Sequence, residues 1–194
     1  MAKKQGEYTA EDYYEIPEEE RCELIDGVIY DYAAPTEIHQ ETQFELGIQL
    51  RDHIKKHGGK CRVILAPSDV RLDLCSVVQP DVYVRCRPGR KDTDAPDFVA
   101  EITSPSTRSK DYIIKLQKYM QTGVREYWII DHDKEQIIVY LFENKELVSM
   151  QKYGFYDPVP VSIWGGACII DLAPIKEAER FWAEEKSGLR EDEL

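Results

Sequence analysis

The stretch that decides the fold is Val77-Val78-Gln79-Pro80-Asp81-Val82-Tyr83-Val84, which is followed by Phe98-Val99-Ala100-Glu101-Ile102-Thr103. Both runs have the character of strands, and each places one acid among hydrophobic neighbours. Because an unpaired carboxylate is costly to bury, each acid needs a partner, and a metal ion is a common one. Asp81 and Glu101 lie twenty residues apart, on runs short enough to form neighbouring strands.

The two acids are placed to act together if their strands pair. Side chains alternate across a strand, so Asp81 shares a face with Tyr83. By the same rule, Glu101 shares a face with Val99 and Thr103. Mg²⁺ prefers oxygen ligands and is often held by one or two carboxylates together with phosphate oxygens. The pattern therefore predicts a site for Mg²⁺ or Mn²⁺, where the ion would activate a water and stabilise negative charge on a phosphate.

Length and composition favour one globular domain. The chain has 194 residues, of which 42% are hydrophobic and 32% charged, and this is enough to bury a substantial core. No apolar stretch approaches the roughly 18 residues of a membrane span, and the N-terminus lacks an apolar signal region. We expect a cytoplasmic protein with a single domain over 1–194, an N-terminal helical segment at 1–20 and a frayed polar tail at 187–194.

The cysteines indicate neither a disulfide framework nor a zinc site. There are five of them, an odd number, and none is in a C-x-x-C spacing. We therefore expect ordinary reduced thiols, as is usual in the cytoplasm. The residues concerned are Cys22, Cys61, Cys75, Cys86 and Cys168.

The net charge of the chain argues against binding of nucleic acid, but the positive charges are clustered in a way that favours it. The chain carries −12, whereas affinity for nucleic acid comes largely from neutralising phosphates. Basic residues gather in 51–62, 85–91 and 103–118, which we expect to lie around the acidic pair. The alternative is that each cluster is an ordinary solvated face.

The N-terminal part of the chain predicts a short helix, a hairpin and a long helix. Thr9 resembles the N-cap of a helix that ends before Pro17. Residues 22–32 form the hairpin, with its turn at Asp26-Gly27. The long helix opens at Pro35-Thr36 and ends near residue 57. Its inward face is expected to carry the residues at helical spacing, which are Phe44, Gly47, Ile48 and Ile54, with Arg51 at the edge.

The rest of the chain alternates strands with helices. Beyond the two acid-bearing runs, strands are expected at 61–65, 68–72, 127–130, 136–141 and 147–153, with helices at 109–121 and 174–186. This mixture indicates an α/β fold with a central mixed β-sheet flanked by helices.

A cation beside the attacking water has to come from the helix after Glu101, because Thr103 cannot serve. The apolar face of that helix is centred on Tyr112, Ile113, Leu116, Tyr119 and Met120. Lys115 lies about 100° from that centre and Lys118 about 160° away, toward solvent. Lys115 can extend along the apolar edge toward the sheet, so we select it as the catalytic cation.

The same residues carry a family resemblance. Pro80-Asp81, then Glu101 within Val-Ala-Glu-Ile-Thr-Ser-Pro-Ser-Thr, then Lys115-Leu116-Gln117-Lys118-Tyr119 resemble the Uma-two family of restriction-type endonucleases, which belongs to the PD-(D/E)xK superfamily. The Glu-Ile-x-Ser-Pro-Ser-Thr segment is the specific part. The likeness extends over most of the chain, through residues 8–13, 23–27, 39–40, 66–72 and 123–128.

The resemblance implies a restriction-endonuclease-like fold, cleavage of nucleic acid (DNA above all) and a homodimer. It implies that Asp81 and Glu101 bind the metal, with the backbone carbonyl of Ile102 as a third ligand. The superfamily's lysine normally stands two residues after the glutamate, where this chain has Thr103. In this family the lysine matches Lys115, on the helix.

Two further residues are accessory candidates, and two other functions stay open. Glu23 could extend the acidic cluster, and His39 could contact a phosphate.

The protein could instead be a nucleic-acid-binding or assembly module with the same fold and weak catalysis, which Thr103 and the acidic net charge favour. A glycosidase that uses two carboxylates is the other alternative, although the sequence has no sugar-binding aromatic pattern.

Overall fold

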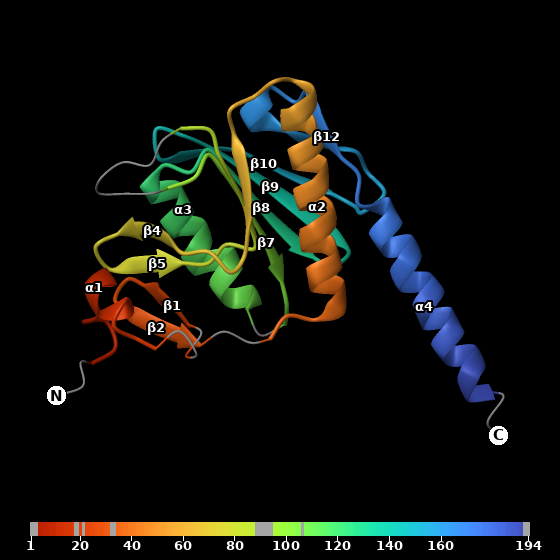
Figure 1. The fold of residues 1–194 in the computed structure, drawn as a ribbon, viewed down its shortest axis with the longest axis horizontal. Coiled ribbons are helices and arrows are strands. Elements are labelled where there is room, and N and C mark those ends of the chain that lie inside the picture. The colour runs from red at the N-terminus through yellow and green to blue at the C-terminus, as the bar shows by residue number, and fades with distance from the viewer. Residues whose placement is uncertain are drawn as a thin grey trace.

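A computed structural model describes residues 4–17, 20, 22–31, 34–87, 95–105 and 107–191, with side chains to 185. Its centre is a six-stranded sheet in the order β10-β9-β8-β7-β6-β3 (Figure 1). Strands β7 and β8 run parallel, and the other neighbours are antiparallel. The sheet is therefore mixed, as expected. The strands are β3 (Arg62–Leu65), β6 (Val82–Arg85), β7 (Phe98–Thr103), β8 (Glu126–Asp131), β9 (Gln136–Glu143) and β10 (Glu146–Tyr153).

The two faces of this sheet are covered by different elements. Helix α2 (Glu37–Lys56) packs on one face, where its Leu46 and Leu50 join a core with Val82 and Ala100. Strands β11 (Val159–Val161) and β12 (Cys168–Ile170) contribute to the same core. Helix α3 (Leu116–Thr122) covers the other face. All six residues of β7 are buried, as is required of a strand between two covered faces.

A second sheet lies on the α3 side, in the order β2-β1-β5-β4 (Figure 1). It consists of β1 (Cys22–Ile25), β2 (Val28–Asp31), β4 (Val70–Asp73) and β5 (Ser76–Val78). The predicted hairpin is confirmed, because β1 and β2 pair around the Asp26-Gly27 turn. The short helix α1 (Ala10–Tyr13) begins at an N-cap on Thr9, also as predicted.

The helix predicted at 109–121 is present, but its first part is a π-helix. Residues Lys110–Lys115 form this segment, η1, and α3 continues from it to end at Gly123. Gly123 has φ 96°, a conformation that glycine adopts without a steric penalty. A π-helical turn holds more residues than an α-helical turn, so it rotates the positions that follow it.

The predicted inward face of α2 was wrong in part. Phe44 is 61% exposed and Ile48 is 39% exposed. The buried residues are instead Thr42, Leu46, Gly47, Leu50 and Ile54. Residues four apart lie on the same side of a helix. The sequence offers two such apolar rows, one through Leu46 and one through Phe44, and periodicity alone does not say which of them faces the core.

The expectation of five reduced thiols was also wrong. Cys61 and Cys86 form a disulfide, whereas Cys22, Cys75 and Cys168 are free. The pairing follows from strand register, since Arg62 of β3 lies opposite Arg85 of β6 and each cysteine flanks one of them. The spacing of the cysteines along the chain does not predict this strand register, and therefore does not predict the disulfide.

The C-terminal part of the described chain ends in a long helix. After the short turn η2 (Ser162–Trp164), helix α4 runs over Ala173–Glu191, past the expected end at 186. Figure 1 shows its C-terminal half projecting from the body of the molecule. Within the described ranges, no helix has the length and apolar character needed to cross a bilayer.

Candidate active site

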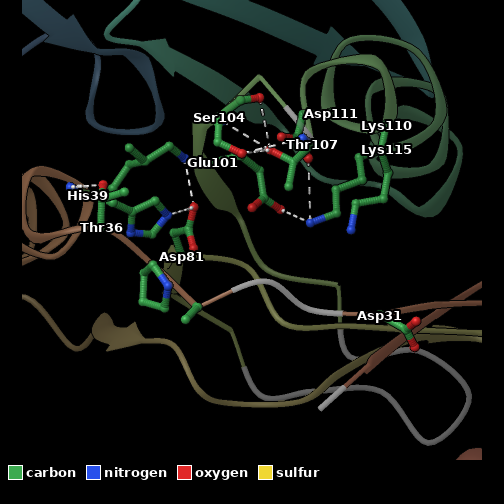
Figure 2. A pocket seen from close by; sticks show the side chains of 13 residues that line it. Asp31, Thr36, His39, Asp81, Glu101, Ser104, Thr107, Lys110, Asp111 and Lys115 are labelled. Carbon is green, nitrogen blue, oxygen red and sulfur yellow. Dashed lines mark hydrogen bonds and ion pairs between the residues drawn. The ribbon is translucent and has the colours of Figure 1, made fainter.

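A small cavity opens where β6 begins and β7 ends, beside the first turn of α2 (Figure 2). Its volume is about 80 Å³. The register of β6 and β7 pairs Val82 with Ala100, which brings the preceding Asp81 next to Glu101. The cavity is lined by Asp31, Ala34, Pro35, Thr36, His39, Asp81, Glu101, Ile102, Ser104, Thr107, Lys110, Asp111 and Lys115.

Asp81 is buried and is held through one carboxylate oxygen. It lies just before β6, because Pro80 interrupts the run that the sequence presents as one strand. The backbone N–H of Ile102 donates to Asp81 Oδ2 at 2.7 Å. His39 Nε2 lies 3.1 Å from the same oxygen, and the other ring nitrogen of His39 is buried with no hydrogen-bond partner among the described residues.

Glu101 is also held through one oxygen. Lys115 Nζ donates to Glu101 Oε1 at 2.9 Å, and the hydroxyl of Tyr119 donates to the same atom at 2.6 Å. No donor in the described part of the chain is within hydrogen-bond distance of Oε2. Figure 2 shows this free oxygen turned toward the side of the cavity where Asp81 lies.

Lys115 is almost completely buried, with 2% of its surface exposed. Besides Glu101, its Nζ contacts Glu23 Oε1 at 2.8 Å and lies 3.7 Å from Asp111 Oδ1. Glu23 is anchored in turn by Lys110 at 2.7 Å. Lys115 and Lys110 lower the pKa of Glu23 even though burial opposes them. The π-helical segment therefore directs two lysines and Asp111 into one acidic cluster.

Burial and excess negative charge perturb this cluster. Burial raises the pKa of Glu101 to about 8, an effect that Lys115 opposes and that Asp81 and Asp111 reinforce. Burial also raises the pKa of Asp111. The pKa of Lys115 lies well above its usual value, because attraction to Glu101 and Glu23 outweighs burial. The lysine is therefore charged, and Glu101 holds a proton more readily than an exposed glutamate.

The structure brings together the side chains selected from the sequence. Asp81, Glu101, Lys115 and His39 all line the cavity, and Ile102 does so as well. Glu23 lies behind Lys115. Lys118 is the exception, since it was expected to point to solvent but is buried and bound to Asp26 and Asp73.

The expected gathering of basic residues around the acidic pair was wrong for two of three clusters. The cluster at 51–62 begins at the far end of α2, and Arg85 ends β6 at the edge opposite Asp81. Arg90 and Lys91 lie outside the described residues. The third cluster, at 103–118, is near the cavity, but its four cations are all paired with carboxylates. Arg108 pairs with Asp131 and Asp133. Lys110 pairs with Glu23, Lys115 with Glu23 and Glu101, and Lys118 with Asp26 and Asp73.

Sequence analysis missed the roles of three residues at the site. Tyr119 was assigned to the apolar face of its helix, yet its hydroxyl bonds to Glu101. Asp111 and Lys110 were not among the residues selected for the site, yet both belong to the cluster around Glu23 and Lys115. The signal that could have identified them is their spacing along 110–119, but it becomes interpretable only when the π-helical segment is known.

The donor set suits a magnesium-like ion that keeps several waters. Within the described ranges, no group of three or more His, Cys, Asp or Glu side chains is arranged as a metal cluster. Two carboxylates with one free oxygen each are nevertheless sufficient for Mg²⁺, which is often bound by one or two carboxylates plus waters. Charge points the same way, because two ammonium groups, Lys110 and Lys115, face four carboxylates: Glu23, Asp81, Glu101 and Asp111.

Comparisons with known proteins agree with this fold. A family model described as "Putative restriction endonuclease", Uma2, matches residues 10–162. A solved structure titled as a putative nuclease belonging to DUF820, from Anabaena variabilis ATCC 29413, aligns with a TM-score of 0.67. The two chains share 21% identity over 87% of this chain and 97% of the other, a likeness that shows the fold. No curated protein matches the chain.

Fold and site together define a protein of the restriction-endonuclease-like class. The chain belongs to the Uma2 family. Membership in that family supports a nuclease function and hence a nucleic-acid substrate.

Proposed function

We propose that the protein is a metal-dependent endonuclease that hydrolyses phosphodiester bonds in DNA. The observation that carries the proposal is the convergence of Asp81, Glu101 and Lys115 on one cavity with an excess of buried negative charge. Such an excess is offset by a divalent cation, and perturbed acids in a cleft are typical of functional sites. The homodimer implied by the resemblance is part of the proposal, and sedimentation of the purified chain tests it.

In this proposal, Asp81 and Glu101 hold Mg²⁺ or Mn²⁺ through their free oxygens, together with the Ile102 carbonyl. The bound ion would lower the pKa of a water and offset charge on the phosphate. His39 and the Ile102 N–H fix the orientation of Asp81. Groups that orient metal ligands in this way determine much of a site's affinity.

Lys115 has one donor to offer the substrate. An ammonium group carries three N–H donors, and two of them go to Glu23 and Glu101. Asp111, at 3.7 Å, is beyond hydrogen-bond distance. The third N–H is therefore left to orient the attacking water or to stabilise charge on the phosphate oxygens.

The test is a nicking assay on supercoiled plasmid with Mg²⁺ or Mn²⁺. We expect the wild-type chain to nick the plasmid, and EDTA to stop it. Asp81→Asn and Glu101→Gln should abolish nicking, whereas Asp52→Asn, an exposed acid of α2, should not affect it. Nicking by the Asp81→Asn protein at the wild-type rate would remove the assignment.

A binding or assembly module with the same fold is the competing function. The two close carboxylate contacts of Lys115 favour it, since an ion-pair cluster of this kind also has a structural use. That module would bind plasmid or oligonucleotide without nicking it at any concentration of Mg²⁺ or Mn²⁺. The same assay, with a gel-shift measurement alongside, separates the two functions.

A further inference from the structure

Basic residues collect at the end of the molecule opposite the cavity. Helix α2 starts at the cavity and ends at the other edge of the sheet (Figure 1). There the chain returns as β3, whose Arg62 lies opposite Arg85 of β6. The set, which we call the basic end, comprises Arg51, Lys55, Lys56, Lys60, Arg62, Arg85 and Arg87.

Arg87 of the basic end is paired with Asp97 at 2.7 Å, but other exposed cations of this set are less neutralised than those near the cavity. Lys60 and Arg62 are exposed, and no carboxylate among the described residues forms an ion pair with either. Lys55 only approaches Asp52, at 4.0 Å. By contrast, Arg108, Lys110, Lys115 and Lys118 are all paired with acids. Among the described residues, the basic end therefore offers exposed cations without a carboxylate partner, whereas the cations around the cavity are paired.

A structural role explains only part of this charge. Cations in the last turn of a helix interact favourably with its dipole, which accounts for Lys55 and Lys56. Lys60 and Arg62 lie beyond Gly58-Gly59, outside the helix, and gain nothing from that effect. A strand edge that carries unpaired cations is instead a surface for a polyanion.

We propose that the basic end binds the phosphodiester backbone of the nucleic acid whose cleavage is proposed above, as an anchoring site remote from the cavity. The inference rests on that proposed function for the identity of the polyanion. Sixteen residues of α-helix separate His39 at the cavity from Lys55, a distance of roughly 24 Å at 1.5 Å per residue. One DNA strand has a phosphate about every 3.4 Å, so the two sites are about seven nucleotide steps apart.

We expect the DNA to contact the protein only at the two ends of α2, at the cavity and at the basic end. The intervening turns of α2 carry Glu41 and Glu45, which would repel a backbone lying along the helix. A duplex should therefore be bound at the cavity and at the basic end, and be bridged by solvent between them. Duplexes shorter than about seven base pairs cannot reach both sites.

The experiment measures binding without cleavage. A fluorescein-labelled duplex of about 20 base pairs is titrated with full-length protein in EDTA, and binding is followed by fluorescence anisotropy. The titration is repeated at salt concentrations from about 50 to about 200 mM, a range over which affinity falls in proportion to the number of phosphate contacts. We compare the double variant Lys60→Glu/Arg62→Glu with Lys145→Glu/Lys152→Glu. The second pair changes net charge equally on exposed residues at the β10 edge, so it controls for overall charge.

We expect the Lys60→Glu/Arg62→Glu protein to bind about tenfold more weakly than the control at the lowest salt, with a log–log salt slope shallower by about two. Equal affinity and equal slope would overturn the proposal. So would a changed sedimentation coefficient with duplex binding unaltered, which would mean that the basic end meets an acidic protein surface.

Failure here is distinguishable from failure of the nuclease assignment. Binding is measured without metal, so an inactive protein can still show the anchoring site. An active protein whose two variants bind alike would keep the nuclease function and lose the anchoring site.

Discussion

Tyr119 donates its hydroxyl to Glu101 at 2.6 Å, and the oxygen that accepts it is the one already bound by Lys115. Both donors therefore act on Oε1 and leave Oε2 for a ligand. The arrangement fixes which oxygen of a buried carboxylate faces the cavity. It assigns Tyr119 a positioning role, because the hydroxyl touches the proposed metal ligand and not the substrate.

Tyr119→Phe removes this contact while keeping the ring in the core. We expect a ten- to hundredfold loss of Mg²⁺ affinity, as is usual when a partner of a metal ligand is removed. Isothermal titration with Mg²⁺ or Mn²⁺ measures it directly. The control is Tyr127→Phe, an equally buried tyrosine whose hydroxyl bonds to the backbone carbonyl of Asp111. Equal metal affinities of the two variants would leave Tyr119 as a packing residue.

Lys115 should be essential for stability as well as for activity. Lys115→Met leaves Glu23 and Glu101 buried without their shared cation, and removing one partner of a buried pair costs about 3–5 kcal/mol. Urea unfolding at pH 7 measures the loss. Lys115→Met combined with Glu23→Gln should recover part of it. If the single and double variants are equally unstable, charge imbalance is not the cause.

The raised pKa of Glu101 predicts how stability depends on pH. Its pKa is about 8 in the folded protein and near 4.5 when unfolded, so the folded state holds this proton more tightly. Stability from this group is fully present below pH 4.5 and is lost as pH rises through 8. Thermal unfolding from pH 5 to 9 should therefore show that Glu101→Gln gains stability relative to wild type as pH rises. A constant difference across this range would contradict the pKa shift.

The paired acid-bearing strands were predictable, whereas the surroundings of Lys115 were only partly so. Alternation along each run gives the face of each acid, and the β6–β7 pairing of Val82 with Ala100 is what sets Asp81 beside Glu101. Helical positions were counted at 100° per residue, and that count failed around the π-helical turn over Lys110–Lys115: Lys118 is buried, and Ile113, expected on the apolar face, is 64% exposed. Long-range register explains the rest, since only the β3–β6 pairing identifies Cys61 and Cys86 as partners.

His39 provides the last test, because it joins helix α2 to a proposed metal ligand. Its Nε2 contacts Asp81 Oδ2 at 3.1 Å, from the first turn of α2. His39→Ala should reduce Mg²⁺ affinity and kcat/KM about ten- to hundredfold with little change in stability, since the side chain is partly exposed. His39→Gln keeps a donor near Asp81 and should restore part of both quantities. The control, His57→Gln, lies at the opposite end of α2 and should behave as wild type. If His39→Ala and His39→Gln are equally impaired, the imidazole does more than orient Asp81, and direct contact with the phosphate becomes the better explanation.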